Sequence, residues 1–330
     1  MKTIVFGGAG FVGLNIVENL LNRGEEVIIF DANPIPLVAN EFFSNLPGKL
    51  VRTQGDVKIK SDIQSALKTN PGAIIYGAAV TAGLERDKNA PSHTLEVNLN
   101  GFLNVLEVAK DYNIKKIINL SSAGAYGEAA FGPGPLDEII TKADPKNIYS
   151  ISKFAAERIA QRLGKIWNME IVNVRLSAVF GRWERQTSVR DTPSPQYQIM
   201  MKALSGNNVL LERPDARDWI YGPDVAEAVR LLRDKESFKY DLYNLSTGKP
   251  WSIEEWGLLL EKEFPGFKCR LVEEGEISNI SSHTSNDRAI LKINKLVDEI
   301  PFDAKFNLKE SIKDYVAWIK AIDMSYFESK

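Results

Sequence analysis

Short apolar runs alternate with longer amphipathic segments through most of the chain. The apolar runs predict buried β-strands at Lys2–Phe6, Val27–Phe30, Leu50–Thr53, Ala73–Tyr76, Lys116–Leu120, Ile171–Leu176 and Tyr243–Leu245. Between them, apolar residues recur three and four positions apart, which predicts α-helices at Phe11–Asn22, Ser61–Leu67, Glu96–Tyr112 and Tyr149–Leu163. Because the strand runs are continuously apolar, we expect an α/β fold with a parallel sheet that helices cover on both faces.

The regular alternation fades after Gly181. Residues 182–219 and 247–330 mix proline, tryptophan, charged residues and short helical patterns. A chain of 330 residues is long for a single core, so we expect two parts. Residues 1–181, joined again by residues 220–246, are predicted to form the sheet domain, and the other two segments a smaller lobe.

Composition and charge narrow the class of protein. Apolar residues make up 44% and charged residues 25%, with a formal net charge of −2, so nothing favours nucleic-acid binding. The sequence has no apolar stretch of membrane-spanning length, and we expect no leader sequence. The one cysteine, Cys269, is interpreted as a buried, inert thiol, which fits a cytoplasmic protein. His93 and His283 are far apart in the sequence, and no cluster has metal-ligand spacing, so we expect no metal.

A glycine-rich segment follows the first predicted strand and opens the first predicted helix. It reads Gly7-Gly8-Ala9-Gly10-Phe11-Val12-Gly13. Glycine is needed where a backbone turns tightly, approaches a pyrophosphate and packs a helix against a strand. Asp31 ends the next strand, 18 residues beyond Gly13. A carboxylate there accepts hydrogen bonds from ribose hydroxyls and repels a 2′-phosphate, so the segment predicts a dinucleotide site that prefers NAD to NADP.

Tyr149 and Lys153 are four residues apart on a predicted helix, so their side chains share one face. Tyrosine is normally too weak an acid to act as a base near neutral pH. An adjacent ammonium and a nicotinamide cation lower its pKa. The segment Ser121–Gly127 (SSAGAYG) follows the fifth strand, at the sheet edge where ligands bind. A hydroxyl from this segment can hold the reacting oxygen beside Tyr149.

Together these motifs resemble the extended short-chain dehydrogenase/reductases, in particular the NAD-dependent epimerase/dehydratase branch that includes UDP-glucose 4-epimerase. The resemblance runs through nearly the whole chain. The other segments that match the family pattern are Asp56-Val57, Gly77-Ala78-Ala79-Val80, Asn98, Arg217–Tyr221 (RDWIY), Asp224-Val225-Ala226 and Tyr243–Gly248 (YNLSTG). It implies a Rossmann-type doubly wound parallel sheet with a smaller C-terminal substrate-binding lobe. It also implies a homodimer formed through the helices Glu96–Tyr112 and Tyr149–Leu163.

The resemblance implies roles for individual residues. Tyr149 is the general acid/base, and Lys153 holds the ribose and tunes Tyr149. Ser122 positions the substrate hydroxyl, because it lies five residues before Gly127, where the family has its Ser or Thr. The implied contacts to NAD come from Gly7, Gly10, Phe11, Val12, Gly13, Asp31, Asp56, Val57, Ala78, Ala79, Val80, Asn98, Tyr149 and Lys153. The candidate substrate contacts are Ser122, Ala123, Arg182, Arg185, Arg190 and Arg217.

The chain departs from the family pattern on the substrate side. Ala178 stands where the epimerases carry an asparagine, and Leu211–Ala216 replaces a glycine-rich stretch, so a substrate smaller than a UDP- or dTDP-sugar stays open. Ala123-Gly124 replaces the Asp-Glu pair of the dehydratases, which ranks elimination below epimerisation and oxidation. The four arginines suit an anionic substrate, and the alternative for them is a solvated, ion-paired loop.

Two enzymatic hypotheses follow. The first is a nucleotide-sugar epimerase that keeps NAD tightly bound. The second is an NAD-dependent dehydrogenase of a sugar acid, uronate or polyol that releases NADH. A third, a non-catalytic NAD sensor or scaffold on the same fold, is disfavoured by the complete set of Ser122, Tyr149 and Lys153. In both enzymatic cases the expected partner is a small sugar molecule, with no nucleic acid and no membrane.

Overall fold

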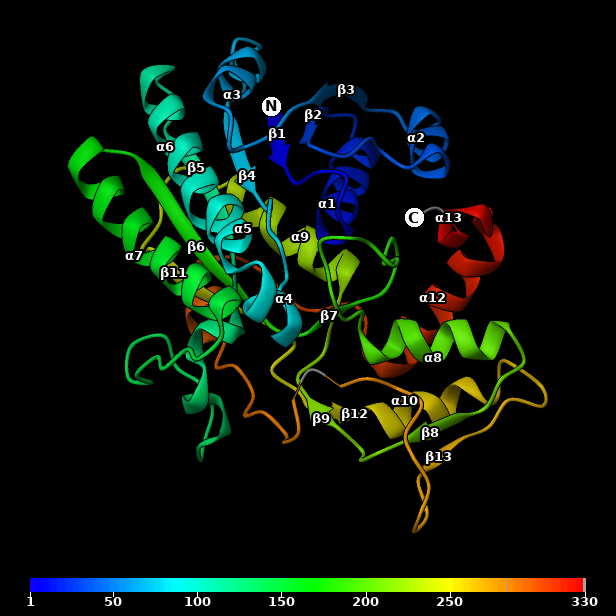
Figure 1. Cartoon of the computed structure of the whole chain (residues 1–330). Coiled ribbons are helices and arrows are strands. Elements are labelled where there is room, and N and C mark those ends of the chain that lie inside the picture. Colours follow the sequence, from blue (N-terminus) through cyan, green and yellow to red (C-terminus); the bar gives the residue numbers. More distant parts are fainter. Residues whose placement is uncertain (283, 329–330) are drawn as a thin grey trace.

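The computed structural model describes residues 1–282 and 284–328, so His283 and the last two residues lie outside it. Its centre is a seven-stranded parallel sheet in the order β11-β6-β5-β4-β1-β2-β3 (Figure 1). The strands are β1 (Lys2–Phe6), β2 (Glu26–Asp31), β3 (Lys49–Gln54), β4 (Ala73–Tyr76), β5 (Lys116–Ser122), β6 (Glu170–Leu176) and β11 (Leu242–Leu245). The predicted strands and the doubly wound α/β fold class are therefore confirmed.

Helices cover both faces of this sheet. Ile4 and Phe6 of β1 face one helical layer, and Val5 between them faces the other. This alternation explains why the strands are apolar at every position. The first layer consists of α3 (Lys60–Leu67), α6 (Gly101–Asp111) and α7 (Ile148–Trp167), and the second of α1 (Phe11–Asn22), α2 (Leu37–Ser44) and α9 (Gly222–Arg233). Of the helices that the structure describes, none has both the length and the apolar character to cross a membrane.

The strand order reverses between β1 and β4. The chain leaves these neighbouring strands in opposite directions, which opens a crevice at their carboxyl ends. Gly7 directly follows β1, Gly77 follows β4, and Ser122 is the last residue of β5. The glycine loop and the Ser122 segment therefore lie along the same edge of the sheet.

The predicted helix Glu96–Tyr112 has a different form in the structure. Helix α4 (Leu84–Asn89) and helix α5 (Pro91–Leu95) come first, and a π-helical turn (Glu96–Asn100) connects α5 to α6. A π-turn inserts a residue and rotates the following side chains, and such turns are frequent at functional sites. Here the turn contains Asn98, which contacts the loop after β4. A search for regular helical spacing does not detect this change of period.

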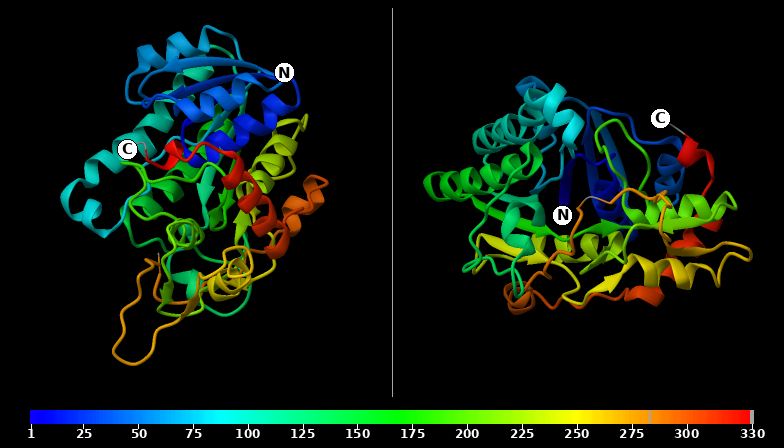
Figure 2. Two further views of the ribbon diagram at one scale, coloured as in Figure 1. Left: turned by 90° about the vertical axis from the view of Figure 1, so that its right-hand side faces the viewer. Right: turned by 60° about the horizontal axis from the view of Figure 1, so that its bottom comes forward.

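Much of the later part of the chain lies beyond the carboxyl edge of the sheet, at the bottom of Figure 1 and towards the viewer in the right-hand view of Figure 2. Helix α13 (Ser325–Glu328) instead lies beside α2, at the right of Figure 1. Beyond the carboxyl edge, the described residues form three two-stranded sheets, β7 with β10, β8 with β13 and β9 with β12. The core around α1 and α9 continues into this region. The elements are β7 (Val179–Phe180), α8 (Pro195–Leu204), β8 (Val209–Leu211), β9 (Ala216–Arg217), β10 (Ile220–Tyr221), β12 (Trp251–Ser252), α10 (Ile253–Leu260), β13 (Cys269–Leu271), α11 (Asn294–Glu299), α12 (Leu308–Ala321) and α13 (Ser325–Glu328).

Candidate active site

A large pocket follows the carboxyl edge of the sheet and encloses about 1280 Å³. Its walls come from the loops after β1, β2, β4 and β5, from the start of α7, and from the segment that precedes α8. Most of the predicted site residues line it, namely Gly7, Gly10, Phe11, Val12, Gly13, Asp31, Asp56, Val57, Ala78, Ala79, Val80, Ser122, Ala123, Tyr149, Lys153, Arg185, Arg190 and Arg217. Asn98 and Arg182 lie outside its lining.

The glycine loop has the shape that a dinucleotide phosphate needs. Gly7 has a φ of +76°, and a Cβ there would lie 2.6 Å from the backbone nitrogen of Ala78. A Cβ on Gly13 would lie 2.2 Å from the Gly7 oxygen, so glycine is required for α1 to pack against the turn. Helix α1 begins after Gly10 without a side-chain cap. Its first N–H groups are therefore left for a ligand, which fits a pyrophosphate.

Asp31 closes the far end of the pocket. One carboxylate oxygen accepts a hydrogen bond from Ala9 N at 3.1 Å and the other from Asn33 N at 2.9 Å. Burial raises the pKa of this carboxyl, against these hydrogen bonds and the positive charge of Arg185. Each oxygen has a second lone pair, so Asp31 can brace the glycine loop and still accept hydrogen bonds from ribose hydroxyls.

We expect Asp31→Asn to shift the preference for NAD over NADP by about tenfold or more, since it removes a charge-assisted acceptor and the repulsion of a 2′-phosphate. Calorimetric titration with both dinucleotides measures this ratio. Asp298→Asn, at an exposed position on α11 outside the pocket, is the control. An unchanged ratio in Asp31→Asn would remove Asp31 from the ribose contact.

Asn98 does not reach the pocket, contrary to its predicted contact with the cofactor. Its side chain is buried, accepts a hydrogen bond from Val80 N at 2.7 Å and donates to Val80 O at 3.0 Å. It also donates to Ser152 Oγ at 3.0 Å. These bonds occupy the amide and join the pocket wall at Val80 to α7. Asn98 therefore positions the wall from behind, which only the π-turn geometry reveals.

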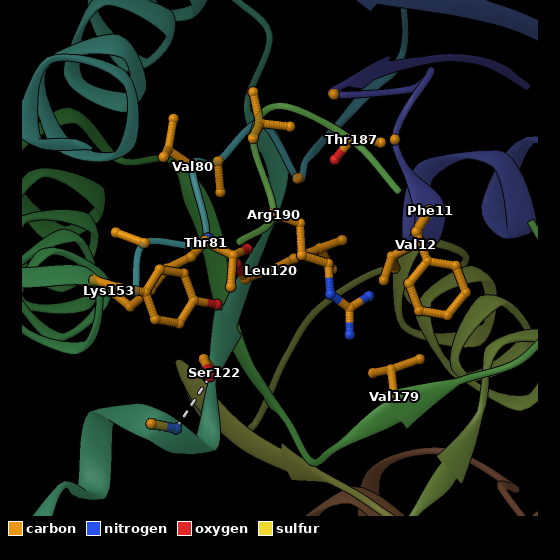
Figure 3. Close-up of a pocket in the computed structure, with 18 of the residues that line it drawn as sticks. Phe11, Val12, Val80, Thr81, Leu120, Ser122, Lys153, Val179, Thr187 and Arg190 are labelled. Atoms are coloured by element: carbon orange, nitrogen blue, oxygen red, sulfur yellow. Dashed lines mark hydrogen bonds between the residues drawn. The ribbon is translucent and has the colours of Figure 1, made fainter. Parts of the chain in front are cut away.

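Tyr149 lies in the first turn of α7 and meets two other hydroxyl groups at the inner end of the pocket. The helix is capped by Asn147, whose side chain accepts a hydrogen bond from Ser150 N at 2.8 Å. Burial raises the pKa of Tyr149 above its usual value of 10, against side-chain hydrogen bonds with Ser122 and Thr81 and the positive charge of Arg190. Figure 3 shows Thr81 and Ser122 at the same end of the pocket as Lys153. The three hydroxyls can thus share a proton network around one substrate oxygen.

Lys153 lies one helical turn after Tyr149 and is buried. Its Nζ donates a hydrogen bond to Leu120 O at 2.9 Å and lies 6.0 Å from the centre of the Tyr149 ring. Burial lowers the pKa of Lys153 to about 8, while the carboxylate of Glu157 raises it. Lys153 and the Tyr149 ring therefore lie on the same face of α7, and burial keeps the pKa of Lys153 below its ordinary value.

Glu157 lies one further turn along α7, behind Lys153. It forms a buried two-armed ion pair with Arg175 of β6, at 2.9 and 2.7 Å, and accepts a hydrogen bond from Ser121 Oγ at 2.6 Å. The Arg175 guanidinium lies 4.3 Å from the centre of the Tyr126 ring. This network joins α7, β5 and β6 behind the reacting groups. The prediction from sequence missed Glu157, although its spacing of four residues from Lys153 was a usable signal.

The four candidate arginines have different surroundings. Arg182 does not face the pocket, because it pairs with Asp314 of α12 and with Glu18 of α1. This pairing corrects its predicted contact with the substrate. Arg185 and Arg190 line the pocket, and their charges act on Asp31 and Tyr149 respectively.

Arg217 also lines the pocket, but acceptors within the protein already hold it. Its Nε donates to Asp215 Oδ1 at 2.8 Å and its Nη2 to Thr284 Oγ1 at 2.7 Å. Arg288 lies in the same wall and pairs with Asp218 at 2.9 Å. The sequence prediction missed Arg288, because it comes from an irregular segment without a recognisable pattern. It also missed Thr81, although Thr81 directly follows the Val80 loop.

Comparisons with known proteins agree with this geometry. The family model described as "NAD dependent epimerase/dehydratase family" matches residues 3–246. The chain is 26% identical to a putative UDP-glucose 4-epimerase of Methanocaldococcus jannaschii, over 96% of this chain and 98% of that protein. It is 29% identical to the bifunctional UDP-glucose 4-epimerase and UDP-xylose 4-epimerase 1 of Pisum sativum, over 97% and 95%.

Among solved structures, the chain resembles the UDP-glucose 4-epimerase of Thermus thermophilus in complex with NAD. The TM-score is 0.77 at 26% identity, covering 97% of this chain and 99% of that one. The family match includes the glycine loop, Ser122 and the helix of Tyr149 and Lys153. This protein is therefore a member of the NAD-dependent epimerase/dehydratase family of enzymes, with NAD as its cofactor.

Proposed function

We propose that this enzyme is a nucleotide-sugar epimerase in which Tyr149 is the acid/base. The observation that carries the proposal is the meeting of the Tyr149, Ser122 and Thr81 hydroxyls beside Lys153, in a pocket that also contains the glycine loop. A hydroxyl of a bound sugar at this point can donate its proton to Tyr149. The similarity to UDP-glucose 4-epimerases over almost the whole chain supports the choice of reaction.

Each residue has a distinct part in the proposed reaction. Ser122 holds the sugar oxygen, Tyr149 takes its proton, and Lys153 stabilises the phenolate of Tyr149 before that proton moves. NAD, when bound, supplies the hydride acceptor and later the donor. Inversion requires that the sugar carbonyl is reduced again from its other face, and Tyr149 then returns the proton to the sugar oxygen. The chain's residues thus perform only positioning and proton transfer.

The residues around Gly124 favour epimerisation over elimination. A Cβ on this residue would lie 2.9 Å from Ser150 Oγ and 3.2 Å from Ser122 Oγ. A side chain at this position would therefore press on both serine hydroxyls. Ala123 and Gly124 supply neither the acid nor the base that elimination needs.

The titration of Lys153 predicts that the activity of the enzyme depends on pH. Burial lowers the pKa of Lys153 from 10.5 to about 8. The side chain is therefore a charged ammonium below this pH and a neutral amine above it. We expect kcat/KM to fall as the pH rises through about 8, because Tyr149 then loses the neighbouring cation. A pH profile of kcat/KM, which reports the groups of the free enzyme, measures this limb. A profile without a break near this pH would contradict the assignment.

A second candidate is a dehydrogenase of a smaller sugar acid, and one observation favours it. Arg217 and Arg288 pair with Asp215 and Asp218, so their charges are balanced within the protein. A nucleotide diphosphate bound there would have to compete with these carboxylates. A uronate or aldonate bound nearer to Tyr149 would not compete with these carboxylates.

The deciding experiment incubates the enzyme with NAD and, separately, with UDP-sugars, uronic acids, aldonic acids and polyols. Absorbance at the NADH band and product NMR are followed together. An inverted carbon without net NADH is expected. Net NADH with one sugar acid would overturn the epimerase proposal in favour of the dehydrogenase. No turnover of any substrate in the panel would contradict both.

A further inference from the structure

Residues 182–192 belong to the connection between β7 and α8 (Figure 1), and Arg185, Thr187–Arg190 and Thr192 line the pocket. Both ends of this segment are anchored. At its start, Arg182 Nε pairs with Asp314 at 2.8 Å, and Tyr326 donates a hydrogen bond to Trp183 O at 2.7 Å. Near its end, Thr81 N donates to Val189 O at 2.7 Å. The segment is therefore held between the α12–α13 region and the loop after β4.

Asp191 strengthens the second anchor. Its carboxylate accepts hydrogen bonds from Gly83 N at 2.8 Å and from Arg86 Nε at 3.1 Å. Arg86 also donates to Ser188 O at 2.8 Å. Since Gly83 follows the pocket-lining loop of β4 and Arg86 belongs to α4, these bonds fix the segment against the pocket wall.

The anchors place Arg190 in the middle of the pocket. Its guanidinium lies 5.2 Å from the centre of the Phe11 ring, at the first residue of α1. On the other side, its charge opposes the rise that burial causes in the pKa of Tyr149. Figure 3 shows the guanidinium between Phe11 and the Lys153 and Ser122 side. Arg190 thus stands between the glycine loop and the reacting groups, where the middle of a bound dinucleotide has to pass.

The guanidinium is only partly engaged by the protein. Its Nη1 pairs with the buried carboxylate of Glu184 at 3.0 Å, and its Nε donates to Thr192 O at 3.3 Å. Its Nη2 has no hydrogen-bond partner among the residues that the structure describes. Glu184 thus fixes Nη1 of the guanidinium, and Nη2 is available to a ligand.

A pyrophosphate at the glycine loop needs such a partner. It carries two negative charges, whereas a helix N-terminus supplies the equivalent of only roughly +0.5 elementary charge. An arginine fork matches phosphate oxygens and adds a full charge. We propose that Arg190 binds the pyrophosphate of NAD, and that residues 182–192 thereby retain the cofactor in the pocket.

This inference uses the cofactor of the proposed function but not the identity of its sugar. An epimerase has to keep its cofactor between the two halves of the reaction, and a segment anchored on both sides serves that need. Arg185, whose charge acts on Asp31, extends the same segment towards the adenosine end. In this proposal the 182–192 segment lies along the bound cofactor, whereas the sequence predicts that its arginines contact the substrate.

The test is calorimetric binding of NAD, ADP-ribose and adenosine to the full chain and to Arg190→Gln. We expect the Kd of NAD and of ADP-ribose, which carry the pyrophosphate, to rise by about tenfold or more, and that of adenosine to change by less than about twofold. Arg270→Gln is the control, because Arg270 is an exposed arginine on β13 that pairs with Glu276 away from the pocket.

Loss of Arg190 leaves the buried Glu184 without its cation, so the single variant can lose stability. The double variant Glu184→Gln/Arg190→Gln removes both charges and repeats the measurement, with thermal unfolding followed in parallel. Unchanged dinucleotide affinity in a folded variant would overturn the proposal, and a raised substrate KM beside it would assign Arg190 to the substrate. Equal weakening of adenosine would also overturn it. Because the binding and unfolding measurements need no sugar, they remain valid if the epimerase proposal fails.

Discussion

Replacing Tyr149 with phenylalanine is expected to lower turnover by about 10²- to 10⁴-fold, the usual contribution of a positioned acid/base. Phenylalanine keeps the ring, which lies 6.0 Å from Lys153 Nζ, and removes only the hydroxyl. Ser122 and Thr81 then retain a substrate oxygen but have no proton acceptor beside them. The glycine loop and Asp31, which are the proposed cofactor contacts, are unchanged in this variant, so bound NAD should remain.

The measurements are turnover of the best substrate and the NAD content of the purified protein. Tyr240→Phe is the matched control, because Tyr240 is exposed and packs against Tyr243 outside the pocket. Retained turnover in Tyr149→Phe would remove Tyr149 from the reaction. Loss of NAD together with activity would show instead that the tyrosine holds the cofactor.

Glu157→Leu is expected to reduce the free energy of unfolding by about 3–5 kcal/mol, because it leaves a buried arginine without its counter-charge. Arg175 and Glu157 are both almost inaccessible to solvent, at 4% and 1% side-chain exposure. The Ser121 hydroxyl also loses its acceptor. Urea unfolding at neutral pH measures the change.

The double variant Glu157→Leu/Arg175→Leu should recover much of this loss, since an apolar pair of similar volume often replaces a buried ion pair at little cost. Glu276→Leu breaks an exposed ion pair with Arg270 and should have little effect. A double variant as unstable as the single one would show that the Ser121 and Tyr126 contacts dominate.

A second measurement distinguishes the electrostatic effect of Glu157 on Lys153 from its structural role. Its carboxylate raises the pKa of Lys153, so Glu157→Gln should move the alkaline limb of the kcat/KM profile to lower pH. A purely structural role would lower activity without moving that limb. Glu157 does not line the pocket, so we propose that it acts as a positioning residue for Lys153.

Local spacing in the sequence was enough to predict much of the site. The Gly7, Gly10 and Gly13 pattern, Asp31 at the end of β2, and the four-residue spacing of Tyr149 and Lys153 are short-range features. They follow from the geometry of one turn or one helix face. The strands were equally readable, because a sheet buried on both faces requires uninterrupted apolar runs.

The irregular segments could not be interpreted in this way, because their side chains are placed by contacts with distant parts of the chain. Arg182 pairs with Asp314, 132 residues away, and Arg190 is positioned through Thr81 and Arg86. Asn98 turns to Val80 only because a π-turn interrupts the helix.

The sequence by itself therefore determined the fold and the family, and it predicts the cofactor loop and the acid/base pair. Only the tertiary structure decided which arginines face the pocket, which are neutralised by Asp215 or Asp218, and that Glu157 lies behind Lys153. The physical reason is that a backbone motif fixes its own geometry, whereas the role of a charged side chain depends on the partner that folding brings to it.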